Sequence, residues 1–185
     1  DTIMLKSDFQ RASLPRRAAC VPAAVVPNGV DEELIASAAA AAAAEKDDGE
    51  ADGEGDGEGD GAPDGTPDGR RGRRPLRLLY TSSYDRGLEH MLRHGWPLIA
   101  AALPTAELHL YYGWRAHEVL HRTSAWRDEM KALIASCGGR VVDHGRVGQP
   151  ELLRAKATAQ ILYYVGDWPE IDCIAVREAA MLGCV

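Results

Sequence analysis

The chain has 185 residues, of which 45% are hydrophobic, and this length is enough for one folded domain of ordinary size. Its formal net charge is −7, but ten of its 28 acidic residues lie in the segment 47–69, which leaves 18 acidic residues against 21 lysines and arginines. The acidic balance therefore says little about the part that folds. No apolar run reaches 18 residues, so the sequence encodes no transmembrane helix.

The N-terminal part of the chain is expected to form a short helix, a strand and a turn. The helix covers 7–12, and the strand is the apolar run 23–26. The turn is Pro27-Asn28-Gly29, because an Asn-Gly pair accepts the positive φ that tight turns need. These elements precede a longer helix.

That longer helix is predicted over 32–45, with Asp31 as its N-cap. It is rich in alanine, the residue with the highest helix propensity. Leu34 and Ile35 are its only sizeable apolar residues. We therefore expect this helix to pack weakly.

An acidic segment follows at 47–69, with no lysine, no arginine and no large apolar side chain. Such a segment cannot bury enough surface to offset its ordering entropy, so we expect a disordered insert. The basic run 70–74 comes next. No aromatic stacking platform accompanies its arginines, and acidic residues lie directly upstream, so we expect a solvated flank and no nucleic-acid partner.

From residue 76 on, strand and helix patterns alternate. The predicted strands are 76–81, 107–112, 141–142 and 161–165, a further one begins at 184, and the predicted helices are 86–92, 98–103, 116–136, 150–159 and 174–182. This alternation predicts an α/β fold, a Rossmann-like parallel sheet with helices on both faces. Ligands of such sheets bind at the carboxyl ends of the strands.

The last quarter of the chain carries the most informative pattern. The apolar run 161–165 is followed by a polar corner with Glu170, and then by a helix that contains Glu178. A helix N-terminus offers free N–H groups and a positive dipole end, both of which favour a phosphate. Carboxylates on either side of it suit the hydroxyl groups of a sugar. The pattern therefore favours a nucleotide-sugar site.

Glu170, seven further residues and Glu178 resemble the ExxxxxxxE signature of retaining glycosyltransferases with two Rossmann-like domains, the GT-B fold. Within this class the pattern is most similar to that of group 1, or family 4. The resemblance implies that residues after 75 correspond to the C-terminal half of a GT-B fold, which binds the nucleotide-sugar donor.

The beginning of the chain resembles the same family. A Ser-x-Phe helix start, a Leu-Pro pair and a Pro-Asn-Gly-Val-Asp turn follow, at 7–9, 14–15 and 27–31, the order found at the end of the N-terminal domain. The implied parts are the end of the N-terminal domain with the hinge (1–31), an Ala-rich helix (32–46), the disordered acidic insert with its basic flank (47–74) and a donor-binding Rossmann-like domain (75–185). The resemblance also implies a fragment, incomplete at its C-terminus.

The loop after the first strand of this domain would bind the diphosphate. The family has a Gly-Arg pair there and a Lys-Gly pair further on, and Arg86-Gly87 can occupy the place of the second pair, where a guanidinium suits a phosphate. Ser82 and Ser83 lie in the same loop and are assigned to donor binding. No arginine stands in the earlier place, near Thr81.

Two further loops complete the expected site. The loop that resembles the family's nucleobase-contacting passage contains Gly145, Arg146 and Val147. In the last loop the resemblance assigns Glu170 to the hydroxyl groups of the donor sugar and Glu178 to those of the ribose. The backbone N–H groups assigned to phosphate and sugar are those of Asp172, Cys173 and Ile174. Glu170 and Arg86 are the expected catalytic residues.

The implied reaction transfers a sugar from a UDP- or GDP-linked donor to an unknown acceptor, with retention at the anomeric carbon. Arg86 and the helix N-terminus would stabilise the departing diphosphate. These groups would take the place of a metal, so the resemblance implies no metal and no cofactor. In addition, the four cysteines show neither CxxC spacing nor a histidine at metal-ligand spacing. Reduced thiols in a cytoplasmic setting are expected.

Two other functions remain open. A non-catalytic binding or scaffold module derived from a glycosyltransferase is favoured by the missing cation near Thr81, whereas the presence of both Glu170 and Glu178 favours the enzyme. Another doubly wound enzyme, such as a dehydrogenase, is disfavoured because no GxGxxG follows the first strand.

Overall fold

The computed structural model describes residues 2–15, 21–47, 76–115, 123–165 and 170–185. At its centre is a four-stranded parallel sheet with the strand order β5-β4-β3-β6. The strands are β3 (Arg77–Tyr80), β4 (Glu107–Leu110), β5 (Val141–Asp143) and β6 (Ile161–Leu162). Because all four run in the same direction, their carboxyl ends meet at one edge. The insert predicted at 47–74 lies, after Asp47, outside the described residues.

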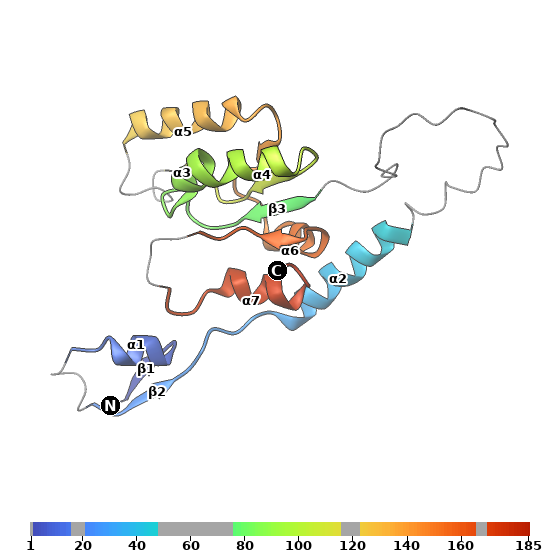
Figure 1. Ribbon diagram of the computed structural model, residues 1–185. Helices are drawn as coiled ribbons and strands as arrows, with labels where there is room; N and C mark the ends of the chain where they lie inside the picture. The colour runs from blue at the N-terminus through green and yellow to red at the C-terminus, as the bar shows by residue number, and fades with distance from the viewer. Residues whose placement is uncertain (1, 16–20, 48–75, 116–122, 166–169) are drawn as a thin grey trace, which may run out of the picture.

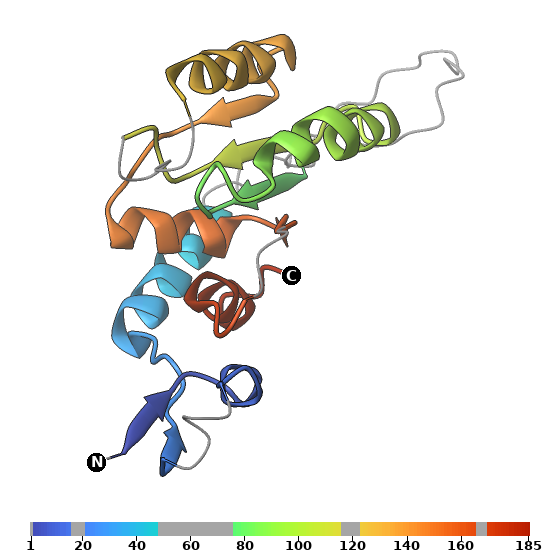
Figure 2. The ribbon, with the colours of Figure 1, turned by 90° about the vertical axis from the view of Figure 1, so that its left-hand side faces the viewer.

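Helices cover both faces of this sheet (Figures 1 and 2). The helical segments on one face are α3 (Leu88–His90), η1 (Met91–Gly95), α4 (Trp96–Ala102) and α5 (Ser124–Ser136). The other face is covered by α6 (Gln149–Thr158) and α7 (Ile174–Met181). The predicted fold, a Rossmann-like parallel sheet with helices on both faces, is confirmed.

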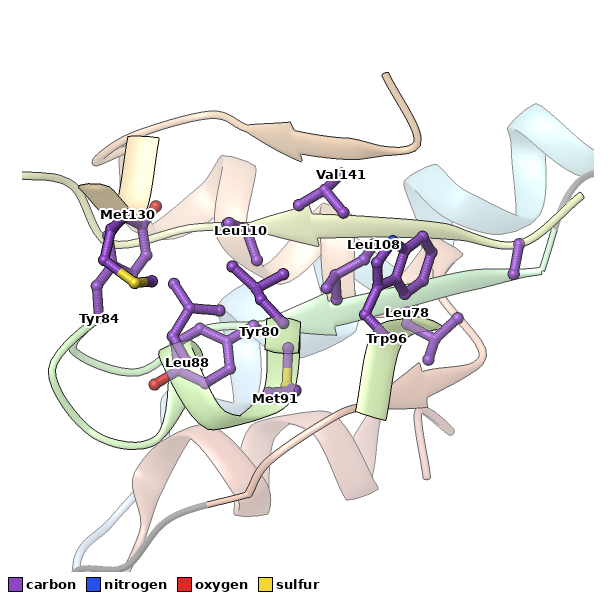
Figure 3. Packing of buried hydrophobic residues seen from close by; sticks show 12 residues of the cluster. Leu78, Tyr80, Tyr84, Leu88, Met91, Trp96, Leu108, Leu110, Met130 and Val141 are labelled. Carbon is purple, nitrogen blue, oxygen red and sulfur yellow. The ribbon is translucent and has the colours of Figure 1, made fainter. Parts of the chain in front are cut away.

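The larger core lies between the sheet and the α3–α5 layer (Figure 3). Alternate residues of a strand share one face, so β3 contributes Leu78 and Tyr80 to this core and β4 contributes Leu108 and Leu110. The helices contribute buried apolar residues, namely Leu88, Met91, Leu92, Trp96 and Met130. Full burial of one such side chain is worth about 1.5–3 kcal/mol, so this layer supplies much of the driving force for folding.

One helical run, 88–102, replaces the two helices predicted on either side of Pro97. The two halves are joined by the π-helical turn η1, whose last bond runs from Trp96 N to Met91 O. Gly95, inside this turn, lies so close to Tyr163 that a Cβ atom there would be 2.0 Å from the tyrosine hydroxyl. The wide turn accommodates the proline without a break, which the sequence pattern did not indicate.

The helix α2 (Glu32–Asp47) packs along α6 (Figure 1). Asp31 caps it, as predicted, because its carboxylate accepts a hydrogen bond from the backbone of the first turn. Ile35 and Ala38 are buried against Leu153 of α6. The expectation of weak packing was wrong, because the alanine Ala38 is buried in this cluster together with Ile35 and adds to the apolar contact.

The N-terminal elements are β1 (Ile3–Leu5), α1 (Asp8–Ala12) and β2 (Ala23–Val25). The predicted helix and strand, α1 and β2, are confirmed. The strand β1 was not predicted, because three residues are too few to show a period. It pairs with β2 in a separate two-stranded parallel sheet.

Two other boundaries differ from the prediction. Thr123 is extended and caps α5 through its side chain, which accepts from Trp126 N at 3.2 Å, so α5 begins at Ser124. Residues 116–122 lie outside the described ones. The strand β6 covers only two of the five predicted residues. Val185 N donates to Gln160 O at 3.1 Å and Val185 O accepts from Leu162 N at 2.7 Å, the parallel pairing expected of the strand predicted to begin at 184.

Candidate functional site

The loops that follow the parallel strands meet at the carboxyl edge of the sheet, where ligands of such folds bind. A cavity of about 170 Å³ opens at this edge. It is lined by residues from four places in the chain, namely Thr81, Tyr111, Tyr112, Arg146, Val147, Gln149 and Leu152. Threonine, tyrosine, arginine and glutamine side chains lie beside the aliphatic valine and leucine, which makes this cavity suitable for a partly polar ring system.

The loop after β3 is fixed by hydrogen bonds to its own backbone. Tyr80 Oη donates to Ser83 O at 2.7 Å and lies 3.0 Å from Arg86 O. Burial raises the pKa of Tyr80, so its hydroxyl stays a proton donor at all ordinary pH values. Ser83 Oγ donates to Asp85 Oδ1 at 2.6 Å. Gly87 has φ 91°, a conformation that favours glycine, and it begins α3.

Arg86 is exposed at this loop, close enough to Tyr164 to affect its pKa. Tyr164 Oη donates to Glu170 Oε2 at 3.0 Å. Burial raises the pKa of Tyr164, its hydrogen bond to Glu170 raises it further, and the Arg86 charge lowers it. Of the two residues expected to be catalytic, Glu170 therefore bonds to Tyr164, and Arg86 acts on the pKa of the same tyrosine through its charge.

The loop after β5 is held by a carboxylate. Asp143 Oδ1 accepts from Tyr84 Oη at 2.6 Å and from Gly145 N at 2.9 Å, and its other oxygen accepts from Trp114 Nε1. Gly145 has φ 66°, again a glycine conformation. The Arg146 guanidinium lies 6.0 Å from the ring centre of Tyr112. This network fixes the start of the loop that lines the cavity.

Glu178 lies in α7 with its side chain 7% exposed. Its Oε2 forms an ion pair with Lys156 Nζ, and Gln149 Nε2 donates to Oε1 at 2.6 Å. Lys156 is fully buried. A buried charge needs a paired and hydrogen-bonded partner, and these two side chains of α6 provide both. Because Gln149 also lines the cavity, Glu178 sits one side chain behind its wall.

The start of α7 is tied to the N-terminal part of the chain. Asn28 N donates to Asp172 Oδ2 at 2.5 Å, and Asn28 Nδ2 donates to Asp172 O at 2.9 Å. Arg177 Nε adds a bond of 2.6 Å to the same carboxylate, and the pKa of Asp172 is lowered by the Asn28 bond first and by Arg177 next. Cys173 is the N-cap and Ile174 the first residue of α7. The Asp172 side chain thus orients the helix start.

The expected site residues lie in three parts of the carboxyl edge. Arg146 and Val147 line the cavity, Gly145 directly precedes them in the chain, and Glu178 bonds to the cavity residue Gln149. Ser82, Ser83, Arg86 and Gly87 belong to the loop after β3, and Glu170 bonds to Tyr164. Asp172, Cys173 and Ile174 form the start of α7. Glu170 and Glu178 bond to different groups, and residues 166–169 between β6 and Glu170 lie outside the described part of the chain.

Sequence reasoning missed several cavity residues, among them Tyr111, Tyr112 and Gln149, and also Lys156. The two tyrosines directly follow β4, a position that marks them as residues of the carboxyl edge. Lys156 gave no signal, because a lysine on a helix is usually exposed. Only the three-dimensional packing of α6 on α7 shows its partner.

In the described residues no group of three or more histidine, cysteine, aspartate or glutamate side chains could hold a metal ion. Across the same residues, no helix is both long enough and apolar enough to cross a membrane. Of the cysteines, Cys137, Cys173 and Cys184 are free.

No protein-family model matches this sequence, and no curated protein matches it. Several solved structures do match the fold. A UDP-forming α,α-trehalose-phosphate synthase from Burkholderia xenovorans has a TM-score of 0.65 at 12% identity, over 100% of this chain and 44% of that one. Anabaena HepE in complex with UDP-glucose has a TM-score of 0.62 at 13% identity, over 99% of this chain and 43% of HepE.

A third match is the N-terminal domain of trehalose-6-phosphate phosphatase from Candida albicans, with a TM-score of 0.60 at 14% identity, over 98% of this chain and 42% of that one. The synthase and HepE are GT-B glycosyltransferases. At these identities the likeness concerns the fold, and the chain spans about two fifths of the length of the structures it matches. The chain therefore has the Rossmann-like fold of part of a GT-B glycosyltransferase, as the sequence resemblance implied.

Proposed function

We propose that this chain forms the nucleotide-sugar-binding part of a retaining glycosyltransferase of the group 1 type, which transfers a sugar from a UDP- or GDP-linked donor to an acceptor hydroxyl. The observation that carries the proposal is the cavity at the carboxyl edge of the sheet, with Glu178 held behind it by Gln149. The fold match to HepE, which was crystallised with UDP-glucose, supports the same ligand class.

In this proposal the cavity receives the nucleoside. Tyr111, Tyr112 and Val147 offer aromatic and aliphatic surface to the base, and Gln149 and Glu178 offer hydrogen-bond groups to the ribose. A ribose hydroxyl can donate to a lone pair of Glu178, because each carboxylate oxygen accepts more than one bond.

The diphosphate would lie between Arg86 and the N-terminus of α7. A guanidinium and free backbone N–H groups both stabilise the charge that develops when the diphosphate departs, so the step needs no metal ion in this proposal. Glu170, which bonds to Tyr164 near Arg86, would bind hydroxyl groups of the donor sugar. A cytoplasmic location stays a prediction.

The test is a calorimetric titration of UDP, GDP and ADP into the protein. We expect one nucleotide to bind with micromolar affinity and its 2′-deoxy form to bind about 1–3 kcal/mol more weakly, because a hydrogen bond to a charged carboxylate is lost. The 2′-deoxy comparison uses the unchanged protein, so it does not depend on the folding of a variant.

A matched pair of variants checks the residue. Glu178→Gln removes the charge that strengthens the ribose hydrogen bond and should reduce the difference between the two nucleotides, whereas Glu151→Gln at the exposed start of α6 should preserve it. Because the first variant also leaves the buried Lys156 without its anion, circular dichroism first establishes that it folds. If no nucleotide binds to the unchanged protein, the donor-site assignment is wrong.

A second candidate function is a non-catalytic binding module. It is favoured by Thr81, which lines the cavity where the resembled family places a cation. Under this alternative a nucleotide sugar binds but is neither transferred nor hydrolysed. Release of UDP from UDP-glucose over hours, followed by chromatography, would separate the enzyme from the module.

A further inference from the structure

The strand β4 carries polar side chains on the face that it turns toward α6. Glu107, His109 and Tyr111 alternate with Leu108 and Leu110, and alternate residues of a strand share one face. His109 lies between the neighbouring strands β3 and β5 and is 8% exposed. An ionisable side chain in such a position needs hydrogen-bond partners.

Both ring nitrogens of His109 have a partner. Nε2 lies 3.2 Å from Glu107 Oε2, and Nδ1 lies 2.8 Å from His144 Nε2. The two imidazole planes differ by 14° with ring centres 5.1 Å apart, the arrangement of rings that meet edge to edge through their nitrogens. His144 also lies flat on Tyr111, with ring centres 4.4 Å apart and planes within 3°.

A continuous series of contacts therefore joins Glu107 to the cavity. Tyr111 forms part of the cavity wall, and His144 directly precedes Gly145, the first residue of the loop whose next members line it. The position of the His144 ring thus affects both a wall residue and a loop. None of these contacts is used by the proposed transfer reaction.

The partners determine how many protons the pair can hold. The Glu107 carboxylate only accepts, so His109 carries its proton on Nε2 and its Nδ1 accepts from His144 Nε2–H when both rings are neutral. One extra proton, on either ring, is compatible with a single N–H···N bond between them. Two extra protons are not, because two N–H groups then face each other across 2.8 Å.

The charges around the pair come from four elements. Burial is the main cause that lowers the pKa of His109, with Arg77 of β3 acting in the same direction and Glu107 against it. Burial also lowers the pKa of His144, against Asp143 of β5 and Glu151 of α6. The net effect favours the neutral pair near pH 7.

We propose that Glu107, His109 and His144 form a positioning relay, which holds Tyr111 and the loop 145–147 against the nucleoside of a bound nucleotide sugar and releases them when both histidines are protonated. The inference rests on the proposed nucleotide-sugar binding. It adds a positioning role for three residues that do not touch the ligand themselves.

The relay is tested first without any nucleotide. NMR titration of the histidine side chains between pH 5 and 8 should show His109 and His144 as a coupled pair, each with an inflection that depends on the other. His144→Phe keeps a ring to stack on Tyr111 but removes the nitrogen, so His109 should then titrate in one step. His94→Phe, an exposed position outside the relay, should leave both titrations unchanged.

The second measurement is the affinity for UDP-glucose over the same range. A sugar nucleotide is the right probe, because its diphosphate lacks the terminal phosphate proton that titrates near pH 6. We expect a constant Kd from pH 8 to 6.5, at least tenfold weaker binding at pH 5, and a less than twofold change over the whole range for His144→Phe.

The outcomes separate the relay from the proposed function. Two results overturn the relay alone, provided that UDP-glucose binds at pH 7.5. The first is that the two histidines titrate independently. The second is that the unchanged protein has the same Kd at pH 5 as at pH 7.5. If UDP-glucose does not bind at any pH, and UDP and GDP show no binding by calorimetry, the nucleotide-site assignment is wrong. The role assigned to the relay is then wrong as well.

Discussion

The two faces of the four-stranded sheet are packed with different kinds of side chain. Toward α3, α4 and α5 the strands present Leu78, Tyr80, Leu108 and Leu110, which meet further apolar and aromatic residues. Toward α6 and α7 the cluster of buried apolar side chains is smaller, and the fully buried Lys156 lies on this side of the sheet.

The difference teaches where stability and chemistry reside in this molecule. An apolar face gains free energy from every side chain it buries, whatever the pH. A face with buried ionisable groups gains little from them, because desolvation consumes most of the gain from pairing. Such groups are expected where a ligand or a proton interacts with them, and α6, which covers this second face, contributes Gln149 and Leu152 to the wall of the candidate cavity.

The largest effect is expected from breaking the buried pair of the polar face. Lys156→Met should lower the free energy of unfolding by about 3–5 kcal/mol, because the Glu178 carboxylate is left buried without its cation. Urea denaturation followed by circular dichroism measures this. The double variant Lys156→Met/Glu178→Leu should recover most of the loss. A double variant as unstable as the single one would mean that the pair stabilises the protein in its own right.

On the apolar face, Leu108→Ala should cost about 3 kcal/mol, within the 2–5 kcal/mol typical of buried leucines, through lost burial and a cavity left in the cluster that also contains Trp96 and Met91. The same urea experiment applies. Leu98→Ala is the matched control, because Leu98 is 73% exposed and its truncation should change stability by less than about 0.5 kcal/mol. Equal effects at the two positions would contradict the packing described for this face.

The smallest effect is a dependence on pH that only the polar face should show. Burial lowers the pKa of both His109 and His144 from that of a free imidazole, so the unfolded chain binds more protons than the folded chain once the pH falls below about 6.5. The free energy of unfolding should therefore be lower at pH 5.5 than at pH 7.5. The decrease should shrink in His109→Phe, and the cost of Leu108→Ala should be the same at both pH values.

The sequence predicted the alternation of strands and helices because buried parallel strands leave strong apolar runs, as at 76–81 and 107–112. It also predicted the cap at Asp31 and the short helix at 7–12, and both depend on local hydrogen bonds. It failed where a contact over a long distance in the chain decides the outcome, as for Ile35 on Leu153 of α6.

The candidate site divides in the same way. Arg86 and Gly145 were assigned to the site from their position after a strand, and Glu170 and Glu178 from their spacing, and these assignments stay predictions. By contrast, Lys156, the partner of Glu178, lies 22 positions away on another helix, and no local sequence pattern predicts this ion pair. Likewise, the polar face of β4 is hidden in a stretch whose leucines dominate the apolar pattern.

The π-helical turn at Met91–Gly95 affects how this chain can be compared with others. A turn closed by an i to i+5 bond holds one residue more than an α-helical turn, so the helix contains what amounts to a single-residue insertion. An alignment with a protein whose corresponding helix is regular needs a one-residue gap at this turn. Without the gap, the helix is shifted by one residue on one side of the turn. Either Leu88, before the turn, or Trp96, after it, is then aligned with a residue from a different face of the other helix.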